Sequence, residues 1–361
     1  MRVLITGGAG FVGSSLACKL RAEPSPDDVI AFDNLHRRGA ELNLPRFKSL
    51  GIQFAHGDVR SATDLDALPG NFDLMIEASA EPSVLAGLQG SPAYVMETNL
   101  SGTLNCLEFA RKRCHAVLFL STSRVYSIDP LRRLALREAA TRFELEPTQA
   151  APGVTAAGIS ETFPLHLPRS LYGASKLASE YIVQEYAYAY GLKAVINRCG
   201  VIAGPGQFGK VDQGVFTLWV ANHYFGLPLR YTGFGGTGKQ VRDLLAPDDL
   251  YELIRKQLAV VDKWSGDTYN VGGGHSGSVS LQELTVLCQQ VTGRNIPIGS
   301  DPDSTMVDIP LYISDHRKVS QAFDWRPRTT PEMIVRAIAD WIGKNESVLR
   351  GIFAENERGR V

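Results

Sequence analysis

The sequence lacks the features of a membrane or exported protein. No apolar run approaches the roughly 20 residues that a helix needs to span a bilayer. The opening MRVLITGG also lacks the charged, long apolar and small-residue segments of a signal peptide. We therefore expect no membrane contact and a cytoplasmic location.

Cysteine is scarce, and no metal-binding spacing is visible. The 5 cysteines are odd in number and none forms a CxxC pair, which argues against a disulfide scaffold and for unpaired thiols in a reducing compartment. The 7 histidines show neither HExxH nor a clustered ligand spacing, so we expect no metal.

Neither sign of charge is in excess. The chain has 37 Lys and Arg against 38 Asp and Glu, and the basic residues are scattered rather than clustered. This pattern argues against nucleic acid or an anionic membrane as the main partner. A hydrophobic content of 44% over 361 residues is typical of a globular protein with a large core, and the length favours two lobes.

The sequence does contain a regular alternation of strand-like and helix-length segments up to about residue 200. The strand-like runs are RVLITG, VIAFD, IQFAHGD, FDLMIEAS, AVLFLS and KAVINR. Strands that are apolar on both faces and alternate with helices predict a parallel sheet covered by helices on both sides, an α/β fold. Beyond residue 200, glycine and proline interrupt the pattern, and we expect a smaller mixed lobe there.

A glycine-rich turn follows the first strand. TGGAGFVG places Gly8, Gly10 and Gly13 at GxGxxG spacing before the helix-like SSLACKL. Glycines allow a tight turn and a close approach of the backbone to a pyrophosphate, which a helix N-terminus attracts. Such a turn can also be purely structural, but its place between strand and helix favours a dinucleotide site.

An acid at the end of the second strand indicates NAD. Asp33 lies twenty positions after Gly13, where a carboxylate accepts hydrogen bonds from the ribose hydroxyls and repels a 2′-phosphate. His36, Arg37 and Arg38 keep NADP as the alternative, since cations at this place accommodate the phosphate.

These motifs divide the chain. We expect residues 1–200 and about 239–272 to form the NAD-binding Rossmann domain, and about 201–238 and 273–345 to form a smaller mixed substrate lobe. Residues 346–361 are expected to be a tail.

Tyr172 and Lys176 form a candidate catalytic pair in LYGASK. They are four residues apart at the start of a helix-like segment, so both lie on one face. A tyrosine ordinarily titrates near pH 10, but a neighbouring ammonium group and a positive nicotinamide ring favour the phenolate. Two such residues can form a mere surface pair, an interpretation that the dinucleotide motif weakens.

Several stretches together resemble the extended short-chain dehydrogenase/reductase family. They are TGGAGFVG, Asn99, the hydroxyl run STS before VY, and YxxxK, and the resemblance extends from residue 1 to about 345. Arg242 and Asp243 in GKQVRDLL, NVGG at 270–273, and WRP at 325–327 match the family's C-terminal landmarks. FDNLHRRGAELNL, GPGQFGKVDQG and GGTGKQVRDLL resemble its CDP-sugar 2-epimerase branch.

The resemblance implies an enzyme with NAD as cofactor and a nucleotide sugar as substrate. Thr122, Tyr172 and Lys176 match the catalytic residues, with Thr122 bonding the sugar hydroxyl that is oxidised. The implied NAD-binding set is Gly7, Gly10, Phe11, Val12, Gly13, Asp33, Asn34, Asp58, Val59, Ala78, Ala80, Asn99, Tyr172 and Lys176. The implied substrate-binding set is Ser123, Arg124, Gln207 and Arg242.

The positions after Thr122 distinguish the reactions of this family. Relatives that eliminate water carry an acidic pair there, since a leaving hydroxyl needs a proton donor, whereas this chain has Ser123 and Arg124. We therefore expect an epimerase acting at C2 of a CDP-sugar. The alternatives are a UDP-sugar 4-epimerase, a dehydrogenase or 4-reductase with net redox, and a non-catalytic dinucleotide sensor.

Four features leave questions open. Asp58 either meets the adenine amino group or caps the next helix, and Glu81 either touches substrate or, as we favour, faces water. The segment 127–169 exceeds a typical loop and is expected to fold over the pocket. The second phosphate-binding arginine that the resemblance implies is replaced by Pro310.

A homodimer is also expected. The helix-like segments 93–112 and 171–190 each carry apolar residues on more than one face, so one face covers the sheet and the other is free for a symmetric partner. The residues concerned are Leu104, Leu107, Leu177, Tyr181 and Tyr188.

Overall fold

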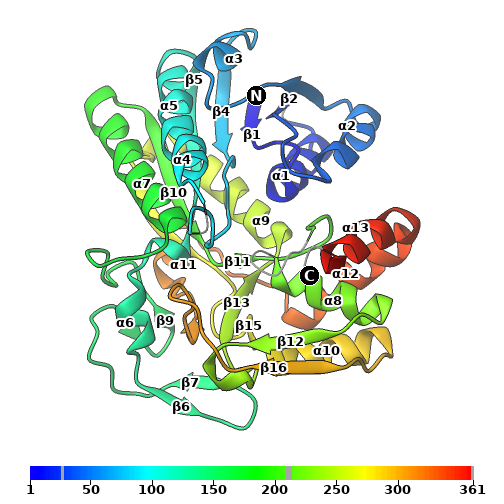
Figure 1. Cartoon of the computed structure of the whole chain (residues 1–361). Coiled ribbons are helices and arrows are strands. Elements are labelled where there is room, and N and C mark those ends of the chain that lie inside the picture. The colour runs from blue at the N-terminus through cyan, green and yellow to red at the C-terminus, as the bar shows by residue number, and fades with distance from the viewer. Residues whose placement is uncertain (26–27, 89, 209–213, 359–361) are drawn as a thin grey trace.

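The computed structural model describes residues 1–25, 28–88, 90–208 and 214–358, and its centre is a seven-stranded sheet (Figure 1). The strand order is β14-β10-β5-β4-β1-β2-β3, and every neighbouring pair is parallel. The strands are β1 (Arg2–Thr6), β2 (Asp28–Asp33), β3 (Gln53–His56), β4 (Phe72–Glu77), β5 (Cys114–Thr122), β10 (Lys193–Cys199) and β14 (Asp267–Val271). The predicted α/β fold with a parallel sheet is confirmed.

Helices cover both faces because each strand is apolar on both sides. In β1, Val3 and Ile5 join one buried cluster while Leu4 joins another on the opposite face. The first cluster includes residues of α1 (Phe11–Ala22), α2 (Leu44–Leu50), α9 (Pro247–Leu258) and α11 (Arg317–Phe323). The second includes residues of α3 (Ala62–Asp66), α5 (Gly102–Arg113) and α7 (Leu171–Tyr190). No helix among the described residues is long and apolar enough to cross a membrane.

The order of the strands positions the site. From β1 the chain adds β2 and β3 on one side and then returns to add β4 and β5 on the other side. The carboxyl ends of β1 and β4 therefore border a switch point, where open α/β sheets bind their ligands.

The C-terminal part builds a smaller sheet around a separate core. Its strands are β11 (Val201–Ile202), β13 (Val241–Leu245), β15 (Ser278–Ser280) and β17 (Leu311–Tyr312), and β12 (Leu229–Thr232) pairs with β16 (Ile298–Asp301). Its helices are α8 (Val215–Phe225), α10 (Leu281–Thr292), α12 (Pro331–Lys344) and α13 (Glu346–Arg358). The expected segment 239–272 is thus divided, because β13 joins the smaller sheet while α9 and β14 return to the large one.

Two expectations need correction. The described part of the predicted tail 346–361 is helix α13, which is anchored because Leu349 and Phe353 are buried against the core of the smaller lobe. The helix-like segment 93–112 is not one regular helix. It is divided into α4 (Ala93–Met96), a π-helical turn η2 (Glu97–Ser101) and α5.

The segment 127–169 folds into short elements of its own. These are α6 (Ile128–Arg132), the hairpin β6 (Leu136–Glu138) and β7 (Phe143–Leu145), and the hairpin β8 (Val154–Thr155) and β9 (Gly158–Ile159). The Phe143 N–H donates to the carbonyl oxygen of Lys239 at 2.9 Å, and Ser280 Oγ donates to the carbonyl oxygen of Thr141 at 2.7 Å. These bonds hold the segment against the smaller lobe. The short 3-10 helices are η1 (Ala40–Asn43), η3 (Ser123–Val125), η4 (Phe234–Gly236) and η5 (Val261–Lys263).

Candidate active site

The glycine-rich turn lies between β1 and α1, as predicted, and close backbone approach requires its glycines. Gly7 has a φ of +63°, and a Cβ there would lie 2.8 Å from the carbonyl oxygen of Ala78. A Cβ on Gly13 would lie 2.2 Å from the carbonyl oxygen of Gly7. The turn is therefore held between the loop after β4 and the first turn of α1, which leaves backbone N–H groups at its surface.

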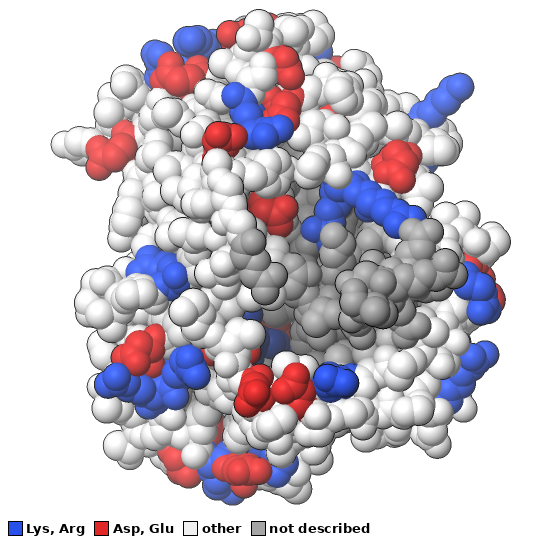
Figure 2. Space-filling view, viewed as in Figure 1, with Lys and Arg blue, Asp and Glu red and all other residues white. Residues whose placement is uncertain are grey.

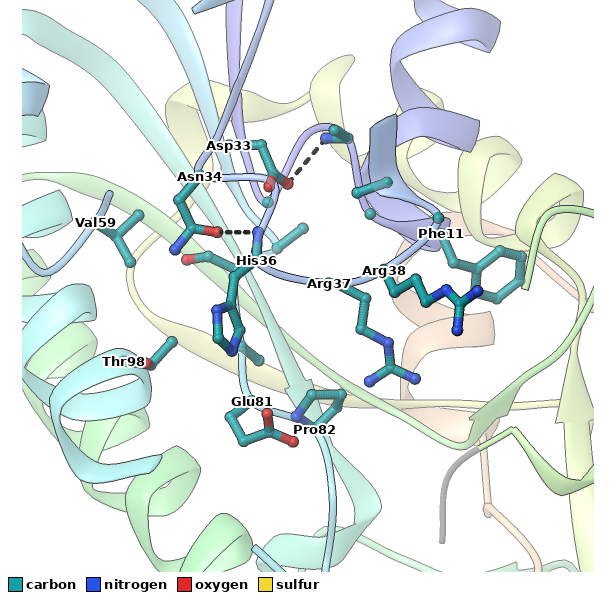
Figure 3. A pocket seen from close by; sticks show the side chains of 18 of the residues that line it. Phe11, Asp33, Asn34, His36, Arg37, Arg38, Val59, Glu81, Pro82 and Thr98 are labelled. Atoms are coloured by element: carbon teal, nitrogen blue, oxygen red, sulfur yellow. Dashed lines mark hydrogen bonds between the residues drawn. The ribbon is translucent and has the colours of Figure 1, made fainter. Parts of the chain in front are cut away.

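Asp33 ties the end of β2 to this turn. Its carboxylate accepts hydrogen bonds from the N–H of Ala9 at 3.0 Å (Figure 3) and from the N–H of Leu35 at 2.8 Å. Burial raises the pKa of Asp33 against the lowering effect of these bonds. Asn34 Oδ1 accepts from the N–H of His36 at 3.0 Å, so the loop after β2 turns directly over the site.

A cavity opens over the glycine turn and joins most of the predicted cofactor residues (Figure 3). Its lining includes Gly7, Gly10, Phe11, Asp33, Asn34, Val59, Ala78 and Ala80. The cavity fits a dinucleotide, because it combines a floor without side chains, a helix N-terminus and an acid at the end of β2. Two predicted residues lie behind this lining: Val12 packs against the core and Gly13 is buried.

Other lining residues were not assigned to the cofactor from the sequence. His36, Arg37 and Arg38 come from the loop after β2, and Tyr94 and Thr98 come from α4 and the π-helical turn. Phe208 and the predicted substrate residue Gln207 reach the same cavity from the smaller lobe. Gln207 is held by the Ile202 carbonyl at 3.1 Å and by Thr217 Oγ1 at 2.7 Å. Nothing local in the sequence places these residues together.

Asp58 does not cap the helix that follows it. That helix, α3, is capped by Ser61, whose side chain accepts from the Asp64 N–H. The Asp58 carboxylate instead accepts from Asn34 Nδ2 at 2.8 Å and from the guanidinium group of Arg60 at 2.7 Å. The hydrogen bonds from Arg60 hold its pKa well below the usual range. The capping interpretation was wrong, and the adenine contact stays a prediction.

Thr122 and Tyr172 are brought together by a glycine contact. Thr122 ends β5, and α7 begins with Ser170 as its cap, whose Oγ accepts from the Gly173 N–H at 3.1 Å. A Cβ on Gly173 would lie 2.1 Å from the carbonyl oxygen of Arg124, so only glycine lets α7 start this close to the turn after β5. Thr122 Oγ1 accepts from the Arg124 N–H at 3.2 Å, and the Thr122 side chain lowers the pKa of Tyr172.

The electrostatics of Tyr172 differ from the expectation. Burial raises its pKa to about 12, while the Thr122 side chain and the charge of Arg124 lower it. Lys176 Nζ lies 3.7 Å from a carboxylate oxygen of Glu77 and 3.9 Å from the ring centroid of Phe119. The lysine charge is thus held by Glu77, and Arg124 is the cation that acts on the tyrosine.

Glu77 was missed by the sequence reasoning. It ends β4, is 1% exposed, and accepts a hydrogen bond from Ser79 Oγ. The available signal was an acid directly after the apolar run LMI at the end of the strand FDLMIE. Glu77 and Lys176 form a buried ion pair at this edge of the sheet, one helical turn from Tyr172.

Asn99 lies in the π-helical turn, a feature that is frequent at functional sites. Its side chain is fully buried and bonds both backbone groups of Glu81, at 2.8 Å and 3.1 Å, and Ser175 Oγ at 3.1 Å. Asn99 therefore joins the loop after β4 to α7. Its predicted contact with the cofactor stays a prediction.

The Glu81 carboxylate lines the cavity and accepts from the Ser83 N–H at 3.1 Å.

Two arginines of the predicted substrate set approach each other across the boundary between the lobes. Arg124 Nη1 donates to the Val307 carbonyl at 3.3 Å, and Arg242 Nη2 donates to the Ile309 carbonyl at 2.8 Å. Figure 2 shows this face of the molecule hollowed between its upper and lower halves. Ser123 is buried beside Arg124 at the carboxyl end of β5.

Known proteins share this architecture. The family model described as NAD dependent epimerase/dehydratase matches residues 3–272. CDP-paratose 2-epimerase from Salmonella typhi is 32% identical over 356 residues, which cover 94% of this chain and 99% of that protein. dTDP-glucose 4,6-dehydratase from Salmonella typhimurium is 27% identical over 94% of this chain and 92% of its own length.

Solved structures extend the likeness to the fold. The UDP-glucose 4-epimerase of Thermus thermophilus in complex with NAD superposes with a TM-score of 0.75 at 27% identity, covering 95% of this chain and 99% of that one. A double mutant of dTDP-glucose 4,6-dehydratase from Streptomyces venezuelae with NAD bound has a TM-score of 0.77 at 27% identity, covering 98% and 100%. Because the family model spans well over half of the sequence, this chain belongs to the NAD-dependent epimerase/dehydratase family and is an NAD-dependent enzyme.

Proposed function

We propose that the enzyme is a nucleotide-sugar epimerase that inverts C2 of a CDP-linked sugar through a transient ketosugar. One observation carries the proposal. Thr122 acts on Tyr172 and lowers its pKa, Lys176 follows one helical turn later, and the two positions after Thr122 hold Ser123 and Arg124 rather than acids. The similarity to CDP-paratose 2-epimerase supports the choice of base and carbon.

The proposed assignment keeps the residues that the sequence indicated. The cavity over the glycine turn would hold NAD through Gly7, Gly10, Phe11, Asp33, Asn34, Val59, Ala78 and Ala80, with Val12, Gly13, Asp58 and Asn99 supporting it. When bound, NAD accepts a hydride from the sugar carbon and returns it to the opposite face. Ser123, Arg124, Gln207 and Arg242 would bind the substrate.

The side chains of this site would accept, return and orient the proton of the sugar hydroxyl group. Tyr172 takes the proton of the sugar hydroxyl as its carbon is oxidised and returns it when the ketone is reduced. The Thr122 side chain and the charge of Arg124 lower the pKa of Tyr172 and so favour the phenolate that accepts this proton. Lys176 is fixed by Glu77 and keeps an ammonium group one helical turn from the tyrosine.

The absence of an acid separates this reaction from dehydration. Loss of a sugar hydroxyl group needs a proton donor, which is typically worth about 10²–10⁴-fold in rate. The charge of Glu81 acts on Tyr172, and the Glu81 carboxylate is engaged by the Ser83 N–H. We therefore expect no robust 4-keto-6-deoxy product when the wild-type enzyme is incubated with CDP-glucose and assayed by absorbance in alkali. A strong signal would contradict the proposal.

Proton NMR with a panel of CDP-, UDP- and dTDP-sugars tests the reaction directly. We expect purified protein to retain NAD and to invert C2 of a CDP-sugar without added nicotinamide, because the hydride is recycled. Inversion at C4 of a UDP-sugar would instead support the 4-epimerase alternative. Stoichiometric NADH would support a dehydrogenase, and binding without turnover would support a sensor.

We further propose a homodimer formed through α5 and α7. Leu107 and Leu177 are buried, whereas Leu104 is 41%, Tyr181 52% and Tyr188 90% exposed on the same helices. This apolar outer face suits a symmetric partner. Light scattering at micromolar concentration should give twice the chain mass. Tyr181→Arg should lower the mass toward that of one chain, whereas Met333→Arg, on the exposed side of α12, should leave it unchanged.

We assign NAD binding to the domain of the large sheet, which holds residues 1–200 with α9 and β14 from the expected segment 239–272. We assign substrate binding to the smaller lobe of about 201–238 and 273–345. We also propose a cytoplasmic location without nucleic-acid or membrane partners. The five cysteines are unpaired and four of them are buried, which suits a reducing compartment. Recovery of the activity in the cytosolic fraction of gently lysed cells tests this assignment.

A further inference from the structure

The cofactor cavity is bordered by residues of both lobes. Gln207 and Phe208 line it from the smaller lobe, while the glycine turn and the loop after β2 line it from the side of the large sheet. The backbone before Phe208 also packs on the start of α1. A Cβ on Gly204 would lie 3.7 Å from Cζ of Phe11, and one on Gly206 would lie 3.9 Å from Cδ2 of the same ring. This stretch of the smaller lobe therefore contacts the large lobe beside the glycine turn.

Phe208 makes a second contact between the lobes, on the loop after β2. A Cβ on Gly39 would lie 2.6 Å from Cε2 and 2.7 Å from Cδ2 of the Phe208 ring, so the ring packs directly on the backbone of this glycine. Gly39 has a φ of +92°, a conformation that other residues rarely adopt. We call the contact between Phe208 and Gly39 the clasp. It joins the two lobes at the border of the cofactor cavity.

The clasp is supported on both of its sides. In the smaller lobe, Phe208 packs against Trp341 of α12, with 5.8 Å between the ring centroids and an interplanar angle of 76°. On the other side, the helix η1 that follows Gly39 is tied to the glycine turn, because Asn43 Nδ2 donates to the carbonyl oxygen of Ala9 at 2.9 Å. The clasp therefore connects two anchored parts of the molecule rather than two free loops.

The loop that the clasp holds carries basic side chains into the cavity. Arg37 and Arg38 both line the cavity, and Figure 3 shows Arg38 beside Phe11 and Arg37 extending toward Pro82. The Arg37 guanidinium group forms no ion pair or hydrogen bond with any residue that the structure describes. A dinucleotide carries two negative phosphates, so a loop with unpaired positive charge beside a helix N-terminus suits it. Holding this loop in place would therefore hold the cofactor.

We propose that Phe208 is a positioning residue that retains NAD, because the clasp keeps the loop 36–39 against the smaller lobe. The inference rests on the proposed function in one respect. An epimerase reduces the ketosugar with the same hydride that it removed, so the reduced cofactor must stay bound until the second transfer. Loss of NADH between the two transfers would strand the ketosugar without a hydride donor. A contact between the lobes at the cofactor cavity meets this requirement.

Exchange of bound NAD for radiolabelled NAD measures the release rate in the purified holoenzyme. Phe208→Ala should speed release by about tenfold or more, because affinity that is lost at a contact appears mostly as faster dissociation. Phe208→Tyr keeps the aromatic ring and should stay within about threefold of the wild type. An unchanged circular dichroism spectrum verifies the fold of each variant.

Phe143→Ala is a matched control. Phe143 is also a half-buried phenylalanine that packs edge-on against a second ring, that of Phe234, with 6.4 Å between the centroids. It is not among the described residues that line the cofactor cavity. This variant should therefore release NAD at the wild-type rate.

Gly39→Ala tests the clasp from its other side. The added Cβ would collide with the Phe208 ring, so this variant should also release NAD faster. In a Phe208→Ala background its effect should be smaller, because the ring that it meets is gone. Two effects that multiply fully would show that the two residues act independently and would overturn the clasp.

The outcomes separate the clasp from the proposed function. Release at the wild-type rate in Phe208→Ala would overturn the clasp. A loss of turnover in that variant with NAD still bound would also overturn it, because Phe208 would then serve the substrate. We expect instead that turnover declines as NADH is released and that added NAD restores it. Stoichiometric release of NADH by the wild type would overturn the proposed function, whereas the exchange rates decide on the clasp by themselves.

Discussion

Helix α7 carries two buried charged residues one turn apart, and their ion pairs are built differently. Glu180 pairs with Arg198 of β10: Nη2 lies 2.6 Å from Oε2, and Nε donates to both carboxylate oxygens at 3.0 Å. Ser121 Oγ donates to the same carboxylate, and Arg198 Nη1 bonds the Tyr126 hydroxyl at 3.2 Å. Almost every polar group of this pair has a partner, and we call it the closed pair.

The open pair, Lys176 and Glu77, lies nearer the catalytic edge. Its two charges are 3.7 Å apart, and one carboxylate oxygen of Glu77 lacks a hydrogen-bond partner among the described residues. Burial lowers the pKa of Lys176 and raises that of Glu77, which opposes the ionisation of both groups.

The difference in hydrogen bonding separates an ion pair with a structural role from one that can act in the reaction. Buried charges with complete hydrogen bonding stabilise one arrangement, whereas a buried ammonium group with spare donors can bind another partner. The closed pair therefore fixes α7 to β10, and the open pair keeps Lys176 available beside Tyr172. Four variants test this difference between buried charged groups.

The largest effect is expected at the catalytic edge. Tyr172→Phe should lower turnover by about 10³-fold or more, because the proton acceptor is lost while the ring still packs. Fold and NAD content should not change. Tyr126→Phe is the control, since its hydroxyl belongs to the closed pair's network, bonding Asn270 at 2.7 Å. It should reduce stability but leave turnover within a few-fold. Turnover within tenfold of wild type in Tyr172→Phe would remove Tyr172 from the role of base.

Breaking the closed pair should destabilise the protein. Glu180→Gln leaves the buried Arg198 charge without its carboxylate, and such losses typically cost about 3–5 kcal/mol in the free energy of unfolding. Urea denaturation measures this change. The control is Glu332→Gln, which breaks an exposed pair with Arg336 on α12 and should cost less than about 1 kcal/mol. A similar small cost in Glu180→Gln would show that the closed pair is not structural.

A third buried acid, which has no ion-pair cation in the described part of the chain, should make stability fall as pH rises. Asp243 accepts from the N–H groups of Gly274 at 3.1 Å and Ser314 at 3.2 Å, and burial raises its pKa to about 6. The folded state therefore retains the proton between the unfolded pKa, near 4, and about 6. Across that interval this group removes up to about 3 kcal/mol as pH rises.

Asp243→Asn tests this effect. The variant cannot ionise, so the difference in unfolding free energy between wild type and variant should shift by about 2–3 kcal/mol in favour of the variant from pH 4 to pH 6.5. Urea denaturation at both pH values measures it. A difference that does not change with pH would show that Asp243 ionises normally in the folded protein.

The smallest effect is expected in the open pair. Glu77→Gln keeps an acceptor for Ser79 but removes the charge that raises the pKa of Lys176. Less of the lysine is then protonated, so kcat should fall by about tenfold at pH 7 and recover partly below it. Stability should change less than in Glu180→Gln. A pH profile identical to that of the wild type would mean that Glu77 does not act through Lys176.

Local spacing in the sequence determined the frame of this protein. Strand runs apolar on both faces predicted the parallel sheet, TGGAGFVG predicted the turn between β1 and α1, and the spacing of Tyr172 and Lys176 placed them together at the start of α7. These features follow from periodicity and backbone conformation over a few residues, so they can be recognised without knowledge of the remaining fold.

Tertiary contacts decided the rest. Glu77 and Lys176 are 99 positions apart, and Arg124 meets Arg242 only because the turn after β5 and the smaller lobe share the segment at 307–309. The expected tail became α13 because Leu349 and Phe353 find an apolar core, and the π-helical turn interrupts the expected helix where Asn99 binds Glu81 and Ser175. Which charge acts on Tyr172 depends on distance and burial in the folded chain, and neither can be read from spacing along the sequence.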